Sequence, residues 1–157
     1  MTTAQHKTQK GFTLIELLVV IGILAILLAI VLIAINPARQ FAQANNTKRN
    51  ADVIAILNAI NQYAADNKGL LPPGMPASGA TQEYINDTAT GANICSSLTP
   101  RYLAALPSDP TAANGGTNIS TCTNYDTGYW VSVGADNRVT VMATYQSPAT
   151  ASISATR

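Results

Sequence analysis

The sequence has few charged residues, few aromatic side chains and almost no histidine. Of its 157 residues, 11% are charged and 6% aromatic, and the formal net charge at pH 7 is +1. Nucleic-acid binding usually requires a basic surface, so this balance argues against DNA or RNA as a partner. Histidine occurs once, at His6, and cysteine twice, at Cys95 and Cys122. This supply provides no zinc ligand set and little material for Ser-His or Cys-His catalysis.

Carboxylates are the catalytic groups that remain, and the chain has eight of them. General acid–base chemistry requires acidic side chains held in defined pairs, and these eight form no recognisable motif. We therefore predict that the chain is not an enzyme and uses no cofactor.

A long hydrophobic run lies near the N-terminus. Leu17 to Ile35 is free of charge, and its 19 residues make about 28 Å of helix. This length is close to the roughly 30 Å hydrocarbon core of a bilayer. Residues 1–11 carry Lys7 and Lys10 and no acidic residue. Positive charge ahead of a span keeps that end cytoplasmic and predicts that the remainder is translocated.

Three interpretations of this run compete. A secretory signal has a shorter apolar region, about 7–15 residues, and a small-x-small cleavage site, which the residues around Leu32 to Pro37 do not offer. A plain signal anchor fits the length and the charge. It leaves unexplained why Glu16, a carboxylate, stands at the edge of a membrane span.

The third interpretation depends on the segment from Lys10 to Glu16, which reads KGFTLIE. This segment resembles the class III signal of type IV pilins and pseudopilins. The resemblance implies that a prepilin peptidase cuts between Gly11 and Phe12 and methylates the new N-terminal Phe12. The hydrophobic run would then be retained, and Glu16 would be the fifth residue of the mature chain.

The cut would give Glu16 a partner. Cleavage creates a charged amine at Phe12, and a spacing of four residues places that amine and Glu16 on one helix face. Between subunits the same pairing penalises any register that leaves one charge alone. In the family the corresponding glutamate guides assembly, and we favour this role for Glu16. The alternative is a contact of an acidic side chain with the first turn of its helix, worth about 0.3–1 kcal/mol.

The helical pattern continues well beyond the hydrophobic run. We predict a membrane-spanning or filament-core helix over residues 12–35 and an amphipathic helix over residues 36–68. Pro37 either kinks one continuous helix or marks the end of the span and the start of a second helix. Beyond it, apolar residues recur at helical spacing, namely Phe41, Ala44, Val53, Ile56, Leu57, Ile60, Tyr63 and Ala64.

Residues 69–157 are predicted to form a globular head. Residues 70–91 are expected to be a surface loop with a turn at Glu83, and residues 96–103 a short helix capped by Ser97 or Thr99. Alternating residues over 129–133 and 139–143 predict a C-terminal β-hairpin. One face of its sheet is expected to bury Val53, Ile56, Leu57 and Ile60, and the tail from Ser147 is expected to fray.

The two cysteines and several loop oxygens are the remaining candidate sites. Because Cys95 and Cys122 follow the span in a segment predicted to be exported, we favour a disulfide between them over two buried thiols. Major pseudopilins carry a calcium site in a comparable loop, which draws attention to Asp109 and Asp126. The residues after Asp109 lack the Trp-Gly-containing run of that family, so we favour solvated side chains and predict no metal.

The sequence as a whole predicts an α+β, pilin-like fold, with a long N-terminal helix and a small antiparallel sheet. The predicted function is that of a pilus subunit, with a type II secretion pseudopilin or a non-polymerising anchored binding domain as alternatives. The predicted partners are other copies, other pilins, prepilin peptidase, the inner-membrane assembly machinery and the membrane. The predicted location is the inner membrane, single-pass with an extracytoplasmic head, and then an extracellular or periplasmic filament.

Overall fold

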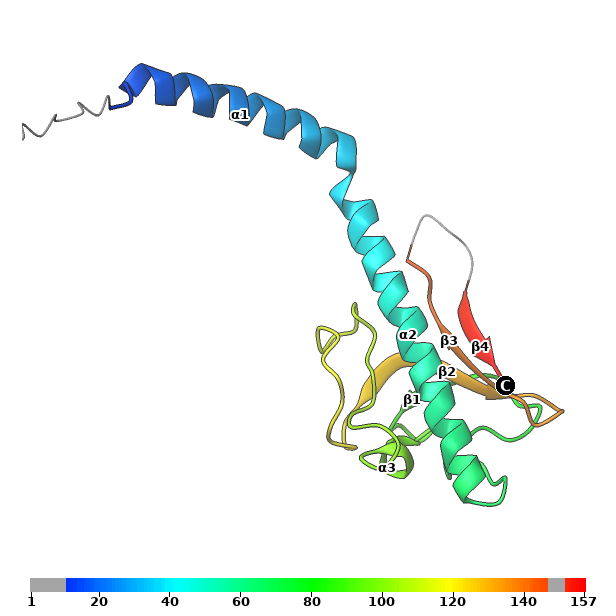
Figure 1. Cartoon of the computed structure of the whole chain (residues 1–157). Helices are drawn as coiled ribbons and strands as arrows, with labels where there is room; N and C mark the ends of the chain where they lie inside the picture. Colours follow the sequence, from blue (N-terminus) through cyan, green and yellow to red (C-terminus); the bar gives the residue numbers. More distant parts are fainter. Residues whose placement is uncertain (1–10, 147–151) are drawn as a thin grey trace, which may run out of the picture. The chain divides into compact units, whose positions relative to one another are not determined.

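The computed structural model describes residues 11–146 and 152–157, and its fold is α+β as the sequence predicted (Figure 1). The chain divides between Gln40 and Phe41 into two units. The elements in chain order are α1 (Leu14–Ile35), α2 (Pro37–Asp66), β1 (Glu83–Asn86), α3 (Cys95–Leu98), β2 (Asp126–Val133), β3 (Val139–Ala143) and β4 (Ile153–Thr156).

The junction between the first two helices is a helix end followed by a new helix start. Pro37 cannot donate a backbone hydrogen bond, and its ring disfavours helical backbone at the residue before it. Asn36 accordingly adopts a left-handed conformation with φ 44°. Its side-chain oxygen then accepts a hydrogen bond from the Arg39 N–H at 3.3 Å, in the manner of an N-cap. Of the two alternatives for Pro37, the second is therefore correct.

Helix α2 is amphipathic along its second half. Val53, Ile56, Leu57 and Ile60 are all 3% exposed or less and lie in the hydrophobic core of the head. The helix ends at Asp66, where Lys68 and Gly69 both have positive φ. The Gly69 N–H donates to the Ala64 carbonyl at 2.7 Å, which satisfies one of the free carbonyls of the last turn.

The head contains a four-stranded antiparallel sheet in the order β1-β2-β3-β4. Its inner face is supplied by alternate residues of β2 and β3, because successive side chains of a strand point to opposite faces. This face and one face of α2 form a single core, whose strand members include Tyr129, Val131, Val133, Val139 and Val141. The predicted β2–β3 hairpin is confirmed, with Val133 paired with Val139.

Three local predictions for the head were wrong. Tyr84 lies in β1 rather than in a turn, because it pairs with Trp130 of β2. Residues 153–156 form β4, so this part of the tail is a strand paired with β3, while residues 147–151 lie outside the described part. Helix α3 begins after Ile94 without a side-chain cap. Strands β1 and β4 depend on hydrogen bonds to a strand that is distant in sequence, which local composition does not reveal.

Candidate processing and assembly segment

Residues 11–13, immediately ahead of α1, are non-helical and open to solvent. Gly11 to Thr13 lack helical structure, and the Phe12 side chain is 85% exposed. A Cβ placed on Gly11 would meet no atom within 4 Å. Neither packing nor backbone conformation therefore explains why position 11 is a glycine. The peptide bond between Gly11 and Phe12 lies in an accessible stretch of backbone, as a cleavage site requires.

A capping box starts α1. The Glu16 carboxylate accepts hydrogen bonds from the Thr13 backbone N–H at 2.7 Å and from the Thr13 hydroxyl at 2.8 Å. The Glu16 N–H donates back to the Thr13 hydroxyl oxygen at 3.3 Å. These bonds satisfy donors at the helix start that have no partner in the helix itself. The first-turn contact that was the alternative role of Glu16 is thus present, whereas the assembly role remains a prediction.

Thr13 is the residue that sequence analysis overlooked at this site. The signal was available, because Thr-x-x-Glu immediately before an apolar run is a known sequence pattern for a helix start. Thr13 positions the carboxylate that the proposed assembly step needs.

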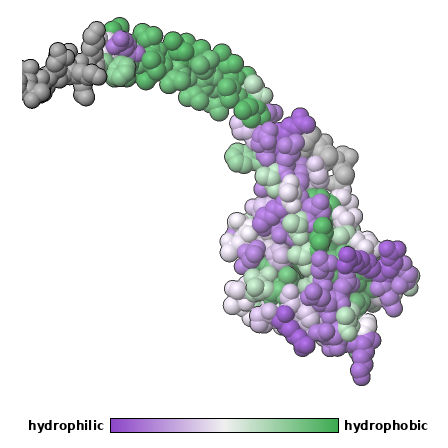
Figure 2. Space-filling model, viewed as in Figure 1, coloured by the Kyte–Doolittle hydropathy of each residue, from purple (hydrophilic) through white to green (hydrophobic). Residues whose placement is uncertain are grey.

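The surface of α1 is apolar on all sides. The helix has 22 residues, none of them buried, and its large hydrophobic side chains are between 48% and 85% exposed. Hydrophobic residues cover the face of α1 that is seen in Figure 2. Water-soluble monomers rarely expose an apolar patch of this extent. By length and composition α1 is able to cross a membrane.

A buried ion pair fixes α2 to the loop that follows α3. The Arg49 Nε–H donates to Asp109 Oδ2 at 2.6 Å, and Arg49 Nη2 donates to Asp109 Oδ1 at 2.9 Å. The Thr111 backbone N–H and hydroxyl also donate to Asp109, at 2.7 and 2.6 Å. On the next turn of α2, Asp52 accepts hydrogen bonds from Tyr129 at 2.7 Å and Lys48 at 3.0 Å.

These contacts shift the protonation equilibria of the groups involved. Burial alone would raise the pKa of Asp109, but the hydrogen bonds from Arg49 and Thr111 outweigh it and hold that pKa below its usual value. The hydrogen bond to Asp109 raises the pKa of Arg49. Burial, reinforced by the hydrogen bond to Asp52, raises the pKa of Tyr129 well above its usual value. The network is therefore fully formed at neutral pH.

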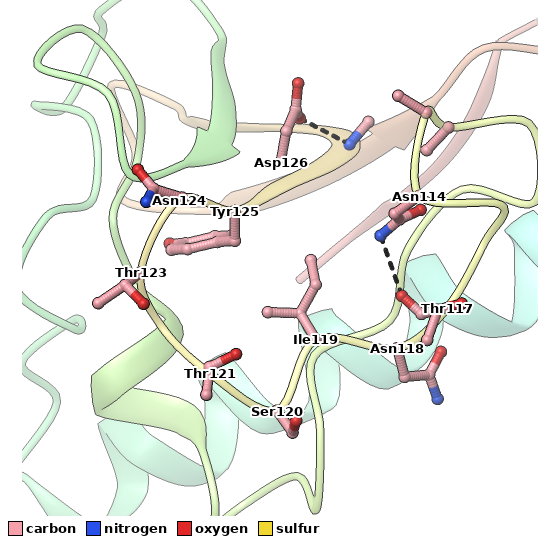
Figure 3. Close-up of a pocket in the computed structure, with 13 residues that line it drawn as sticks. Asn114, Thr117, Asn118, Ile119, Ser120, Thr121, Thr123, Asn124, Tyr125 and Asp126 are labelled. Carbon is pink, nitrogen blue, oxygen red and sulfur yellow. Dashed lines mark hydrogen bonds between the residues drawn. The ribbon is translucent and has the colours of Figure 1, made fainter.

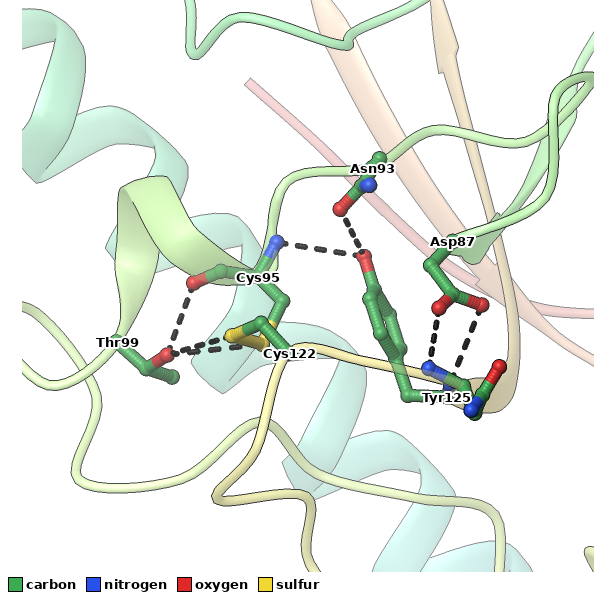
Figure 4. Close-up of a disulfide and its surroundings, with 7 residues drawn as sticks. Asp87, Asn93, Cys95, Thr99, Cys122 and Tyr125 are labelled. Atoms are coloured by element: carbon green, nitrogen blue, oxygen red, sulfur yellow. Dashed lines mark hydrogen bonds between the residues drawn. A yellow bond between two sulfur atoms is a disulfide. The ribbon is translucent and has the colours of Figure 1, made fainter.

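A disulfide joins Cys95 of α3 to Cys122, with a Cα–Cα distance of 5.5 Å (Figure 4). The Thr99 hydroxyl lies 3.3 Å from the Cys122 sulfur and donates to the Cys95 carbonyl at 2.9 Å. Nearby, the Tyr125 hydroxyl donates to Asn93 at 3.0 Å and accepts from the Cys95 N–H at 3.4 Å. The disulfide joins residues 27 positions apart and so closes a loop between α3 and β2.

The N-terminal segment matches known proteins. A family model described as a prokaryotic N-terminal methylation motif matches residues 6–32. Type II secretion system core protein G of Aeromonas hydrophila is 38% identical over 108 residues, which are 68% of this chain and 70% of that protein. The chain belongs to the type IV pilin and type II secretion pseudopilin family.

Other relatives of this pilin-family chain include both a secretion protein and a fimbrial protein. Core protein G of Escherichia coli K12 is 28% identical over 103 residues, which are 65% of this chain and 66% of that protein. Fimbrial protein Q of Moraxella bovis is 39% identical over 92 residues, which are 57% of this chain and 55% of that protein. No solved structure matches this chain significantly. These relatives are named as secretion and fimbrial proteins rather than as enzymes.

The loop considered for calcium surrounds a hollow of ≈ 570 Å³, lined by neutral polar and apolar side chains and by Asp126 (Figure 3). Asp126 is exposed, and its Oδ1 accepts a hydrogen bond from the Gly128 N–H at 2.9 Å. Asp109 does not line the hollow, and its carboxylate accepts hydrogen bonds from Arg49 and Thr111. Among the residues that the structure describes, no three His, Cys, Asp or Glu side chains gather as a metal site would require.

Proposed function

We propose that this pilin-family chain is the structural subunit of a pilus. In this proposal a prepilin peptidase cuts between Gly11 and Phe12 and methylates Phe12, and the mature chain then polymerises. The observation that carries the proposal is α1, a 22-residue apolar helix without a buried residue, joined directly to the exposed Gly11–Phe12 junction. Such a surface needs hydrocarbon before assembly and other apolar helices after it.

The proposed role of Glu16 is compatible with its place in the capping box. Both hydrogen bonds from Thr13 end on Glu16 Oε2, and Oε1 has no partner among the described residues. The carboxylate therefore keeps one oxygen for an amine. In the proposal the charged amine of Phe12, in the same chain or in the next subunit, pairs with that oxygen. Mismatched registers are penalised because they leave a charge unpaired in an apolar surrounding.

The proposed location follows from the same elements. In this proposal the subunit is a single-pass protein of the inner membrane, because α1 has the length and composition of a membrane span and the basic residues ahead of it favour an extracytoplasmic head. The proposed partners are other copies, other pilins, prepilin peptidase and the inner-membrane assembly machinery. After extraction from the membrane the subunit would lie in an extracellular or periplasmic filament.

A second candidate function is that of a type II secretion pseudopilin. The similarity to core protein G of Aeromonas hydrophila favours it, whereas the similarity to fimbrial protein Q favours a pilus. The two functions are distinguished by comparing the host strain with a strain that lacks the gene for this chain. Loss of surface filaments in electron micrographs supports the pilus, and loss of secreted hydrolases with filaments intact supports the pseudopilin.

The intact mass of the protein from cells that contain prepilin peptidase tests processing. We expect the mass of residues 12–157 with one added methyl group. A chain that retains residues 1–11 would indicate a plain anchor and would contradict the proposal. A chain cut beyond Ile35 would indicate an exported soluble domain and would contradict it equally.

Two variants separate the assembly role of Glu16 from helix capping. Glu16→Ala removes the carboxylate, whereas Thr13→Val removes only the capping hydroxyl, which is worth about 1 kcal/mol. We expect both variants to insert in the membrane, and we expect filament yield to collapse for Glu16→Ala only. Equal yields for the two variants would reduce Glu16 to a capping residue. The yield is measured by shearing filaments from cells and comparing them with the membrane pool.

A further inference from the structure

An open groove of ≈ 440 Å³ lies on the head, bounded by α2, β1, β2 and the segment after β3. Tyr84 and Trp130 line it from β1 and β2, Arg49 lines it from α2, and residues 144–146 after β3 close another side. All of these residues belong to the unit that starts at Phe41. The volume of the groove lies within the range of small-molecule sites, which is about 300–1,000 Å³.

Two aromatic rings line the groove, of which Tyr84 is exposed and Trp130 half-buried. Tyr84 and Trp130 are cross-strand partners on the outer face of the sheet, with ring centroids 4.7 Å apart and planes tilted by 42°. Tyr84 is 47% exposed, although aromatic side chains of this size usually contribute to a core. Within the described residues neither the Tyr84 hydroxyl nor the Trp130 indole N–H has a hydrogen-bond partner.

The polar side of the groove is formed by a buried group that retains one free donor. Arg49 is 3% exposed and Asp109 5% exposed, and both line the groove. A guanidinium has five N–H donors. Four of them are used by Asp109, Thr111 and Asn46. The fifth, on Arg49 Nη1, has no acceptor among the described residues. Nη1 already donates to Asn46, so this second N–H is available to a ligand hydroxyl in the groove.

The charges at the groove select the class of ligand. Arg49 and Asp109 neutralise each other, so the groove favours neither an anion nor a cation. The aromatic rings of Tyr84 and Trp130 can pack against an apolar face of a ligand. The Arg49 N–H, the Trp130 indole N–H and the Tyr84 hydroxyl favour a ligand that also carries several hydroxyl groups. A pyranose has both features, with C–H groups on one face and hydroxyls on its rim. We propose that this groove binds a neutral saccharide, which rests on Trp130 and Tyr84 and accepts a hydrogen bond from Arg49.

This proposal is independent of filament formation. Every group that it uses lies between Phe41 and Gln146, and none belongs to α1 or to the Gly11–Phe12 junction. A chain that is never cut and never polymerises would still bind the saccharide. Failure of the mass experiment therefore leaves this proposal standing, and the reverse also holds.

The test uses the full chain in micelles of a polyoxyethylene detergent, because glucoside and maltoside detergents would compete for the groove. Trp130 is the single tryptophan of the sequence, so its fluorescence reports on the proposed site alone. The probes are cellotriose, maltotriose and triacetylchitotriose, each titrated to millimolar concentration. Tetramethylammonium chloride serves as a comparison, because aromatic rings also bind such cations.

We expect a saturable change of Trp130 emission with at least one trisaccharide and none with tetramethylammonium. Tyr84→Ala should raise the dissociation constant about tenfold or more while preserving the Trp130 signal. Tyr102→Ala is the matched control, because it removes a tyrosine near Asp66, about 25 Å along α2 from Arg49. Equal affinities of the two variants, saturation by tetramethylammonium only, or no saturation by any of the three sugars would overturn the proposal.

Discussion

The two long helices of this pilin-family chain have the same backbone structure but differ in how much of their surface is buried. Helix α1 has 22 residues and buries none of them, whereas α2 has 30 residues and buries eight. Helix α1 is apolar on every side, so its backbone and its surface both suit hydrocarbon. Helix α2 has one apolar face, and its stability depends on packing against the sheet. The head should therefore be stable by itself, whereas α1 depends on its surroundings.

The comparison extends to their charged residues. In α1 the only charged residue is Glu16, which is exposed and held by its own helix start. In α2 the charges of Arg49 and Asp52 are held by residues of the head that are far away in sequence. Charged residues of α2 thus contribute to the folding of the head, whereas the charge on α1 remains available for intermolecular contacts.

The largest effect is expected from Arg49→Met. The substitution leaves the Asp109 carboxylate buried without its cation, which typically costs about 3–5 kcal/mol. The free energy of unfolding is measured in guanidinium on the full chain in micelles, with Trp130 fluorescence as the signal of the head. Because the remaining charge is the cause, the double variant Arg49→Met, Asp109→Leu should recover most of the loss. A loss below about 1 kcal/mol for the single variant would contradict the burial of this pair.

A pair of isoleucine substitutions tests the contrast between the helices directly. Ile56 of α2 is 0% exposed, and Ile26 of α1 is 63% exposed. Ile56→Ala should lower the free energy of unfolding of the head by about 2–5 kcal/mol, because it leaves a cavity in the core. Ile26→Ala should leave the same transition unchanged, since α1 has no buried residue. A shift of the guanidinium midpoint for Ile26→Ala would show that α1 supports the head.

The parts of the fold that local pattern determines were predictable. The apolar run predicts α1, and alternation over residues 129–133 and 139–143 predicts the hairpin, because each pattern lies within one segment. The capping hydroxyl of Thr13 was equally local and was overlooked. The peptidase and assembly roles of Gly11, Phe12 and Glu16 rest on resemblance to the family and stay predictions.

The parts that depend on distant partners were not predictable. Arg49 and Asp109 are separated by 60 residues, and nothing in either segment indicates that they meet. Strand β1 exists because Tyr84 pairs with Trp130, and β4 because Ile153 pairs with Ala143. The groove beside the aromatic pair has the same origin, since α2, β1, β2 and the segment after β3 each supply one side of it.

Acid is expected to weaken the head through Asp109. Its pKa is lower in the folded head than the value of about 3.9 usual for an unfolded chain. The folded state therefore binds fewer protons, so this stabilisation is complete above about pH 4 and is lost as the pH falls through the folded pKa. One such group changes the free energy of unfolding by at most about 1.4 kcal/mol per pH unit. Asp109→Asn should be less stable at pH 7 and should show a shallower decline below pH 4. An unchanged slope in this variant would assign the acid sensitivity to other carboxylates.

The smallest effect is expected from Arg101→Ala, which completes the contrast between buried and exposed groups within the head. Arg101 contacts Asp66 at 3.2 Å, as Arg49 contacts Asp109, but its side chain is 72% exposed. Water solvates both partners when the pair is broken, so the loss should be about 0.2–1 kcal/mol. The same guanidinium titration of the full chain measures it. Arg49→Met and Arg101→Ala each remove one guanidinium from an ion pair with an aspartate, but Arg49 binds a buried Asp109 through two N–H groups and Arg101 binds an exposed Asp66 through one. Similar losses for the two would mean that desolvation of Asp109 does not govern the stability of the head, and the explanation of the Arg49 network would have to rest on its hydrogen bonds alone.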